Sequence, residues 1–264
     1  MTPDTTISIP QTLIAAMQQA KHIVVFTGSG VSAESGIATF RDALTGLWER
    51  FNVKDLATPE AFRRDEELVW GWYEWRRMKV LRAQPNPAHI AIASLARYVP
   101  KLTVITQNVD DLHERAGSVG VLHLHGSLHS PRCADCSQAH SLPRGIPEEP
   151  EAGRRVRPPR CMNCGGSVRP GVVWFGEDLP GKIISDAIAA ARDCSVLIVI
   201  GTSGLVEPAA RLPHLAMQNG AKVVQVNPSS TPLDDACTWS LRGAAGSVIP
   251  FLLQTFFLST SQGG

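Results

Sequence analysis

Two pairs of cysteines have the spacing of a metal site. Cys133 and Cys136 form one C-x-x-C motif, and Cys161 and Cys164 form a second, with residues 137–160 between them. Two thiolates on a tight turn can occupy adjacent corners of a tetrahedron, and a second such pair closes it. Four sulfur ligands leave no coordination position open. The sequence therefore predicts one zinc ion with a structural role, with two redox-active pairs or idle thiols as the alternative.

A glycine-rich turn follows the apolar run at residues 23–26, which suits a strand buried on both faces. Gly28 and Gly30 permit a tight turn and let backbone N–H groups approach a ligand, and Ser32 is expected to cap a helix. Such an arrangement predicts an anion site. The next glycine is Gly36 and no GK[ST] follows, so neither the dinucleotide fingerprint nor a P-loop fits. A glycine turn without a ligand is the alternative.

The elements that position these residues alternate along the chain. Short apolar runs predict strands, and apolar positions at helical spacing predict helices. Their alternation indicates an α/β protein with a mostly parallel sheet and helices on both faces. The strands are expected at residues 23–26, 102–106, 121–125, 195–200 and 222–226, and the helices at 9–20, within 42–82, and at 89–98, 183–192, 208–218 and 248–258.

Polar segments follow four of the predicted strands. Ligands of parallel α/β sheets bind outside the carboxyl ends of the strands. These segments should therefore line one crevice. They are residues 28–30, 107–110, 201–203 and Asn227.

Composition narrows the class of protein. The chain has 264 residues, 44% of them hydrophobic, which is enough for a full core and one small appended module. A net charge of +1 argues against a dominant role in binding polyanions. The first residues lack the features of a secretory signal, and no uncharged run is long enough to span a membrane. We expect a monomer in the cytoplasm, where cysteines stay reduced.

Residues 131–170 differ in composition from the rest of the chain and form a separate small module. Four arginines lie between residues 154 and 160, and a zinc module with arginines could bind nucleic acid. However, the module lacks aromatic residues for base stacking, and three glutamates at 148–151 nearly cancel the charge. A solvated loop is therefore the favoured interpretation, and nucleic acid is not expected as a partner.

Seven motifs occur in the order found in sirtuins, and the chain resembles this family from about residue 20 to residue 251. They are GSGVSAESGIATFRD, TQNVDDLHERAG, LHLHGSL, the two C-x-x-C pairs, VVWFGE, GTSGLVEPAA and QVNP. The resemblance implies a Rossmann-like, doubly wound parallel sheet with a smaller zinc-binding and helical lobe. NAD and an acylated lysine would enter the cleft between them. The implied divisions are a Rossmann-like domain at 1–41, 84–130 and 171–264, a helical acyl-pocket segment at 42–83, and the zinc-binding module at 131–170.

The resemblance also implies which residues bind NAD. The glycine loop would hold the pyrophosphate, and the segment after it would cover the nicotinamide ribose. The other strand ends would bind the ribose, the nicotinamide amide and the adenosine. The loop and its cover contribute Gly28, Ser29, Gly30, Ser32, Ala33, Glu34, Ile37, Phe40, Arg41 and Trp48; the strand ends contribute Gln107, Asn108, Asp110, His125, Gly201, Thr202, Ser203 and Asn227, with Ala245 at the adenine rim.

His125 matches the catalytic base of the family, and Asn108 is the second residue assigned to catalysis. In the implied reaction the acyl oxygen attacks C1′ of the nicotinamide ribose as nicotinamide leaves, while Asn108 and Asp110 orient the leaving amide. His125 then takes a proton from a ribose hydroxyl, a role that suits a neutral imidazole. His123, which alternates with it, is interpreted as a satisfied core histidine. The products are free lysine, nicotinamide and 2′-O-acyl-ADP-ribose, and zinc takes no part.

Tyr73 and Arg76 are three residues apart, so on a helix they share a face. They match the YxxR pair of the desuccinylating, class III, sirtuins. A guanidinium can bind a carboxylate through two hydrogen bonds, and a phenol can donate another. The pair predicts that succinyl, malonyl or glutaryl groups are removed faster than acetyl; the alternative is a helix packed by its tryptophans, with Arg76 reaching solvent. Backbone pairing with the substrate peptide is assigned to Val172, Val173, Trp174, Phe175, Gly176 and Glu177.

Three other functions remain open on the sequence. The chain could be mainly a lysine deacetylase, or a mono-ADP-ribosyltransferase, which would release nicotinamide without needing an acyl-lysine. It could also be a non-enzymatic NAD-sensing or nucleic-acid-binding zinc protein, although an intact His125 and Asn108 argue against that.

Three positions depart from the usual family pattern. Ser29, Asp111 and Glu207 stand where the family more often has alanine, glycine, and an aromatic or neutral residue. Their effect on the affinity for the cofactor or the peptide is not predicted.

Overall fold

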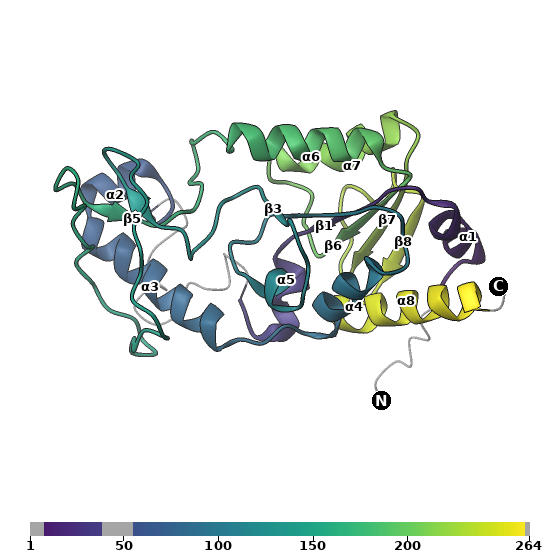
Figure 1. Cartoon of the computed structure of the whole chain (residues 1–264), viewed down its shortest axis with the longest axis horizontal. Helices are drawn as coiled ribbons and strands as arrows, with labels where there is room; N and C mark the ends of the chain where they lie inside the picture. The colour runs from purple at the N-terminus through teal and green to yellow at the C-terminus, as the bar shows by residue number, and fades with distance from the viewer. Residues whose placement is uncertain (1–7, 39–54, 262–264) are drawn as a thin grey trace.

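The structure is a computed structural model that describes residues 8–38 and 55–261. Its centre is a six-stranded sheet in the order β3-β2-β1-β6-β7-β8, and every pairing in it is parallel. Figure 1 shows the strands side by side on the right of the molecule. The strands are β1 (Ile23–Thr27), β2 (Leu102–Thr106), β3 (Leu122–His123), β6 (Val196–Ile200), β7 (Lys222–Asn227) and β8 (Trp239–Arg242).

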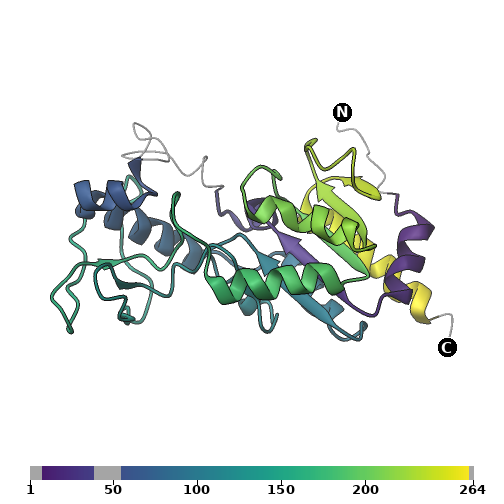
Figure 2. The same cartoon turned by 90° about the horizontal axis from the view of Figure 1, so that it is seen from above.

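Helices cover both faces of this sheet (Figures 1 and 2). One face carries α1 (Gln11–Gln19), α4 (Pro87–Leu95) and α8 (Ala245–Ser261), and the other carries α6 (Gly181–Asp193) and α7 (Leu212–Gln218). The short α5 (Leu112–Arg115) follows β2. The predicted α/β class and doubly wound sheet are confirmed. None of the helices within the described ranges has the length and apolar content needed to cross a membrane.

The alternation of side chains along each strand builds two separate cores. In β1, Ile23 and Val25 join the cluster under α1, α4 and α8, whereas Val24 and Phe26 join the cluster under α6 and α7. All four are essentially inaccessible to solvent. A strand buried on both faces reads as a continuous apolar run, and for this reason β1, β2, β6 and β7 could be predicted.

One strand prediction was wrong in extent, and one strand was missed. β3 has two residues instead of the predicted five, since the chain leaves the sheet after His123. β8 was missed because it lies at an edge, where Trp239 is half-buried and only Leu241 is buried. An edge strand with one buried side chain carries too little apolar pattern to be recognised.

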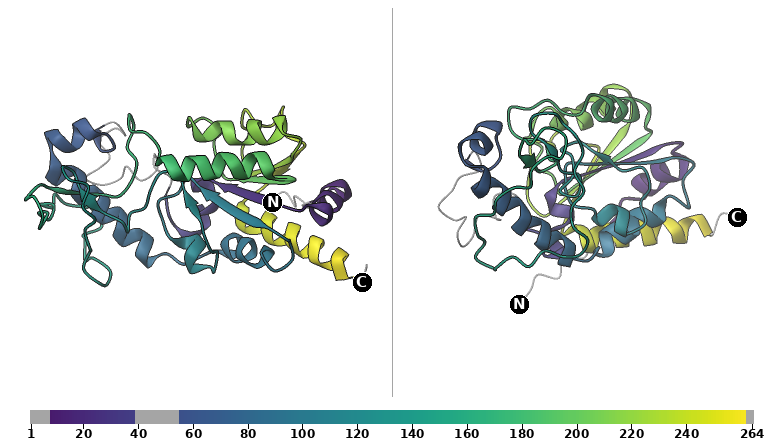
Figure 3. Two further views of the ribbon diagram at one scale, coloured as in Figure 1. Left: turned by 45° about the horizontal axis from the view of Figure 1, so that its top comes forward. Right: turned by 60° about the vertical axis from the view of Figure 1, so that its left-hand side comes forward.

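A smaller lobe lies beside the sheet, at the left of Figure 1 and of the left view in Figure 3. It contains α2 (Pro59–Arg64), α3 (Glu66–Arg82) and a two-stranded sheet of β4 (Arg132–Cys133) and β5 (Val168–Arg169). Thr58 caps α2, because its hydroxyl accepts from Ala61 N at 3.1 Å. A third apolar cluster holds the lobe together and includes Trp72, Tyr73 and Trp174.

Within the segment that joins the two cysteine pairs, residues 146–160 are bound along α3, and we call them the strap. The indole N–H of Trp75 donates to the carbonyl oxygen of Glu151 at 3.1 Å, and Val156 N donates to that of Glu67 at 3.0 Å. The arginines of the strap pair with acidic residues, most of them on α3 or its cap: Arg154 with Glu149, Arg155 with Asp65, Arg157 with Glu67, and Arg160 with Glu66. The strap is mostly exposed, as predicted for a solvated loop, and its arginine side chains are 52–78% exposed. The sequence could not show that its charges have partners about 90 residues away.

Candidate active site

The glycines after β1 are required by the contact between two loops. A Cβ atom at Gly28 would lie 2.7 Å from the carbonyl oxygen of Gly201, and one at Gly30 would lie 2.7 Å from Gly201 Cα. Gly28 N donates to Ile200 O and Gly30 N to Gly201 O, both at 2.9 Å. Gly201 itself has φ +60°, which favours glycine. The loops after β1 and β6 are thus fixed against one another at the carboxyl edge of the sheet.

Ser32 does not cap an α-helix, and that prediction was wrong. The chain after β1 forms two 3-10 turns, Ser29–Val31 and Ala33–Ser35, and the Ser32 side chain makes no capping hydrogen bond. Its hydroxyl instead donates to Asp110 Oδ2 at 3.1 Å and accepts from Asn108 Nδ2 at 3.1 Å. The three side chains form one buried polar cluster. They come from the ends of β1 and β2, as the predicted crevice requires.

Burial and hydrogen bonds shift the pKa of Asp110 in opposite directions. Burial raises its pKa, and the hydrogen bonds from Leu112 N and Ser32 act to lower it; burial prevails. The backbone hydrogen bond from Leu112 N reaches Oδ1 at 3.1 Å, so both carboxylate oxygens are engaged. The carboxyl group is therefore held in one orientation beside Asn108.

The remaining strand ends meet at Thr202. Gln107 Nε2 donates to Thr202 Oγ1 at 2.9 Å, and Asn227 Nδ2 donates to Thr202 O at 2.9 Å. These bonds join the ends of β2, β6 and β7. The four polar segments therefore meet at one edge of the sheet, whereas the crevice that they should line stays a prediction. Their donors and acceptors are hydroxyls, amides and a carboxyl group, a set that suits the ribose hydroxyls and carboxamide of a dinucleotide.

His125 has a hydrogen bond that fixes its tautomer. Its Nδ1 lies 3.0 Å from the carbonyl oxygen of Gln107, and a carbonyl only accepts, so Nδ1 carries the proton. Burial lowers the pKa of His125, although this hydrogen bond acts to raise it. The imidazole is consequently neutral near pH 7, with an unprotonated Nε2 that can accept a proton.

His123 differs from His125 in the protonation of its imidazole ring. Its Nδ1 lies 3.0 Å from Asn108 O and its Nε2 lies 2.7 Å from Glu114 Oε1, so both nitrogens face acceptors and both carry protons. Burial acts to lower the pKa of His123, but the hydrogen bonds and charge of Glu114 raise it above its usual value. As expected of a satisfied histidine, it has no lone pair available for catalysis.

Two further histidines lie behind the polar cluster, and sequence reasoning did not single them out. His113 Nε2 contacts Thr27 Oγ1 at 3.0 Å, and Thr27 donates to Thr106 Oγ1, which accepts from Asn108 N at 3.0 Å. His89 Nε2 lies 3.4 Å from Ser32 Oγ, and the two imidazole rings are 4.9 Å apart. No local pattern marks these residues, because their burial comes entirely from tertiary packing.

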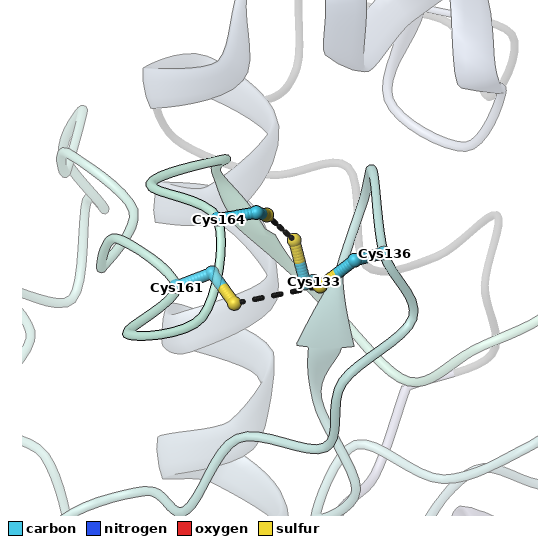
Figure 4. A group of neighbouring side chains, drawn as sticks. All are labelled: Cys133, Cys136, Cys161 and Cys164. Carbon is cyan, nitrogen blue, oxygen red and sulfur yellow. Dashed lines mark hydrogen bonds between the residues drawn. The ribbon is translucent and has the colours of Figure 1, made fainter.

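The four paired cysteines converge on one point, shown in Figure 4. Cys133 Sγ lies 3.4 Å from Cys164 Sγ, and Cys136 Sγ lies 3.6 Å from Cys161 Sγ. All four sulfur atoms lie within 4.8 Å of one another. A tetrahedron of thiolates around zinc has edges of about 3.8 Å, from a Zn–S distance of about 2.3 Å. The set therefore fits a zinc ion, as predicted.

Tyr73 and Arg76 lie on α3, as the helical spacing predicted. The side chain of Tyr73 is 3% exposed, and its hydroxyl accepts from the indole N–H of Trp174 at 3.0 Å. Burial raises the pKa of Tyr73, so the phenol keeps its proton. Burial lowers the pKa of Arg76, whereas electrostatic interactions with Tyr73 and Asp110 act to raise it. Arg76 is thus within electrostatic reach of both the small lobe and the polar cluster.

The segment at residues 172–177 is fixed by hydrogen bonds within the chain. Val173 N donates to His125 O, Phe175 N to Ala57 O, and Trp174 N to Glu177 Oε2, at 2.8, 3.0 and 2.8 Å. Glu177 also forms a bidentate ion pair with Arg169. Its side chain therefore holds the segment in place, while Phe175 and Gly176 are exposed.

The other predicted site residues differ in their exposure. Ser29, Ala33, Glu34 and Ser203 are exposed, Ile37 is half-buried, and Ala245 is the buried first residue of α8. Glu34 accepts from Gly246 N at 2.5 Å and so links the first loop to α8. Phe40, Arg41 and Trp48 lie outside the described residues.

Two of the departures from the family pattern have partners within the chain. Asp111 lies 3.5 Å from both Arg115 and His129, and Glu207 lies 3.0 Å from Arg211. Ser29 is exposed beside the glycine turn.

Comparison with known proteins agrees with this geometry. The model of the Sir2 family matches residues 28–208, more than half of the chain. An NAD-dependent protein deacylase of Methylococcus capsulatus is 63% identical over 242 residues, which cover 92% of this chain and 95% of that protein.

Two solved structures are also similar. A Sir2 homologue in complex with NAD has a TM-score of 0.87 and 44% identity, covering 96% of each chain. Sir2 bound to an acetylated peptide has a TM-score of 0.80 and 28% identity, covering 94% of this chain and 98% of that one. By its family match, its relative and its fold, the chain belongs to the Sir2 family, the sirtuins.

Proposed function

We propose that the chain is an NAD-dependent protein-lysine deacylase that removes succinyl, malonyl or glutaryl groups faster than acetyl. The relative from Methylococcus capsulatus, which bears the name of this activity, supports the general reaction. The Sir2 complex with an acetylated peptide supports acylated lysine as the class of substrate. The preference for acidic acyl groups rests on α3 alone.

His125 is proposed as the general base. Bound NAD would supply the ribose carbon that accepts the acyl group. The protonated Nδ1 of His125, held by the Gln107 carbonyl, leaves Nε2 to accept a proton from a ribose hydroxyl. The lowered pKa of His125 keeps that nitrogen unprotonated at neutral pH.

Asn108 and Asp110 are proposed to orient the carboxamide of the nicotinamide. Ser32 holds both side chains, and Thr106 holds the backbone of Asn108. A polar group fixed before the substrate arrives loses little entropy on binding, so it can orient a leaving group efficiently. The four cysteines would hold zinc, whose role is to join the two ends of the strap and not to act on the substrate.

One observation carries the acyl preference: Arg76 is close enough to Tyr73 and to Asp110 for both to affect its pKa. The Arg76 guanidinium therefore interacts electrostatically with the phenol and with the polar cluster. Its Cζ also lies 4.9 Å from the ring centroid of Trp72, which fixes the side chain against α3. A carboxylate at the end of an acyl chain could bind the guanidinium and the phenol together.

The test is a panel of matched peptides carrying succinyl-, malonyl-, glutaryl- or acetyl-lysine, assayed with and without NAD. We expect desuccinylation to exceed deacetylation in kcat/KM. The substitution Arg76→Met should cost about 2–4 kcal/mol toward succinyl-lysine, the range for leaving a charge unpaired, and much less toward acetyl-lysine. Arg76→Lys is the matched control, because it keeps the charge and loses the bidentate geometry.

Equal or better turnover of acetyl-lysine by the wild type would refute the acidic preference and favour a deacetylase. Nicotinamide release that does not depend on an acylated peptide would instead favour a mono-ADP-ribosyltransferase. Binding of NAD without any release would favour a sensor. The ion pairs between the strap arginines and acidic residues support a protein without a nucleic-acid partner. We also propose that the chain is a monomer and that it acts in the cytoplasm.

A further inference from the structure

The side chain of Trp174 is held on several sides. It is 3% exposed, its ring lies 5.4 Å from that of Phe62, and the guanidinium carbon of Arg169 lies 3.5 Å from its ring centroid. Its backbone is fixed as well, because Trp174 N donates to Glu177 Oε2 at 2.8 Å and Glu177 N donates to Trp174 O at 3.0 Å. A side chain with so many contacts has one orientation, and that orientation aims its indole N–H at Tyr73.

Arg169 contacts both the Glu177 carboxylate and the indole ring of Trp174, and so links the two. It forms two hydrogen bonds with the Glu177 carboxylate and a third, at 3.0 Å, with Val172 O. Its side chain is 9% exposed. Burial acts to raise the pKa of Glu177, but the hydrogen bonds from Arg169 and Trp174 N hold it below its usual value. The carboxylate therefore stays charged, and the planar guanidinium stays stacked on the ring.

The hydrogen bond has a direction that matters for Tyr73. An indole N–H only donates, so it occupies a lone pair of the phenol oxygen, at 3.0 Å, and leaves the phenol proton unused. A hydroxyl that accepts a hydrogen bond also becomes a better donor. The second aromatic contact of Tyr73, an edge contact with Trp72 at 4.7 Å, keeps its ring from turning.

We propose that Trp174 is a positioning residue for acyl-group selection, which turns the Tyr73 hydroxyl so that its proton is available to the carboxylate of an acidic acyl chain. The proposal rests on the proposed function. It adds that residues 169–177 select the acyl group through a side chain of their own, in addition to any backbone contact with the peptide.

The test is Trp174→Phe, which removes the N–H and keeps an aromatic ring. We expect the ratio of desuccinylation to deacetylation, in kcat/KM, to fall about 5- to 10-fold, the effect of one hydrogen bond, with most of the change in KM for the succinyl peptide. The matched control is Trp75→Phe on α3. It also removes a hydrogen bond that an indole N–H donates, at 3.1 Å to Glu151 O, but this hydrogen bond joins α3 to the strap. That control should leave the ratio unchanged.

A double-mutant cycle separates positioning from packing. If Trp174 acts through the Tyr73 hydroxyl, Trp174→Phe should not lower the ratio further in a Tyr73→Phe background. A further fall there would overturn the proposal, and so would an equal loss on both substrates in the single variant. If Trp174→Phe unfolds the protein, Arg169→Lys serves instead, because it weakens the stack on the ring and should lower the same ratio.

The two proposals fail differently. A wild type that prefers acetyl-lysine refutes the proposed function, and this inference with it. A wild type that prefers succinyl-lysine, with a ratio that Trp174→Phe leaves unchanged, refutes only the role of Trp174.

Discussion

The buried histidines behind the polar cluster should make folding stability depend on pH in a defined direction. His89 and His113 are 0% and 1% exposed. Burial lowers the pKa of His89 to about 4, and burial with the charges of His89 and His123 lowers that of His113 to about 3. The hydrogen bonds of His89 also require its neutral form. Ser32 donates to Asp110, so it accepts from His89 Nε2, while His89 Nδ1 accepts from Asn86 N.

The direction in which stability changes with pH follows from the number of protons that the folded and unfolded states bind. An unfolded histidine has a pKa of about 6.5. Between that value and the lower folded pKa the unfolded state binds more protons, so stability is fully present above pH 6.5 and is lost as the pH falls. From pH 6 to pH 5, the difference between pKa values of about 6.5 and about 4 or 3 amounts to about 1 kcal/mol for each residue, or about 2 kcal/mol for both.

The assay is urea unfolding at pH 5, 5.5, 6 and 6.5 with zinc in excess, for the wild type and for His89→Gln and His113→Gln. Each substitution will lower stability at every pH, because it alters a buried contact. The informative quantity is the change with pH, which should be smaller by about 1 kcal/mol over one pH unit in each variant. Titration of the cysteines is common to all three proteins and cancels in the comparison.

A variant that loses stability between pH 6 and pH 5 as steeply as the wild type would refute the reasoning. It would show that the replaced histidine is already protonated in the folded protein. For His89 that would mean that Nδ1 does not accept the hydrogen bond from Asn86 N.

Two further predictions concern the small lobe. Cobalt added to metal-free protein should bind at one equivalent with the absorption of a tetrahedral thiolate site, and replacing Cys133 or Cys161 by serine should abolish that spectrum; an octahedral spectrum would contradict the four-sulfur site. Gly71→Ala should lower the free energy of unfolding by about 1–3 kcal/mol, since the added Cβ would collide with the carbonyl oxygen of Arg154 in the strap. Gly181→Ala is the control, because a Cβ there meets nothing within 4 Å, and an equal loss in both variants would show that the strap does not pack on Gly71.

The sequence predicts most of the sheet because physical requirements act locally there. A strand such as β6 (Val196–Ile200), buried on both faces, must be continuously apolar, and the parallel order of such strands brings their polar ends to one edge. Gln107, Thr202 and Asn227 could therefore be expected to meet. An edge strand such as β8 obeys no such requirement, and for that reason it was missed.

The candidate site divides in the same way. Side chains whose type and spacing suffice for chemistry were found from the sequence: the paired cysteines, His125, and the Tyr73–Arg76 face of α3. Contacts between side chains that are distant in the sequence were not found: Trp174 was expected only to pair through its backbone, and His113 was not singled out. Trp174 is 101 residues from Tyr73, and His113 is 86 residues from Thr27.

By itself the sequence determined the α/β class, the zinc ligands and the family, because each depends on residue types at short, fixed spacings. Tertiary structure alone supplied the physical reason why His125, and not His123, can act as a base. His123 meets two acceptors and stays protonated, whereas His125 meets one and keeps a lone pair on Nε2. It also decided that the glycines of the first turn serve the contact with Gly201, and that Ser32 holds Asn108 and Asp110 instead of capping a helix. A hydrogen bond depends on the position and direction of both partners, and only the folded chain supplies these.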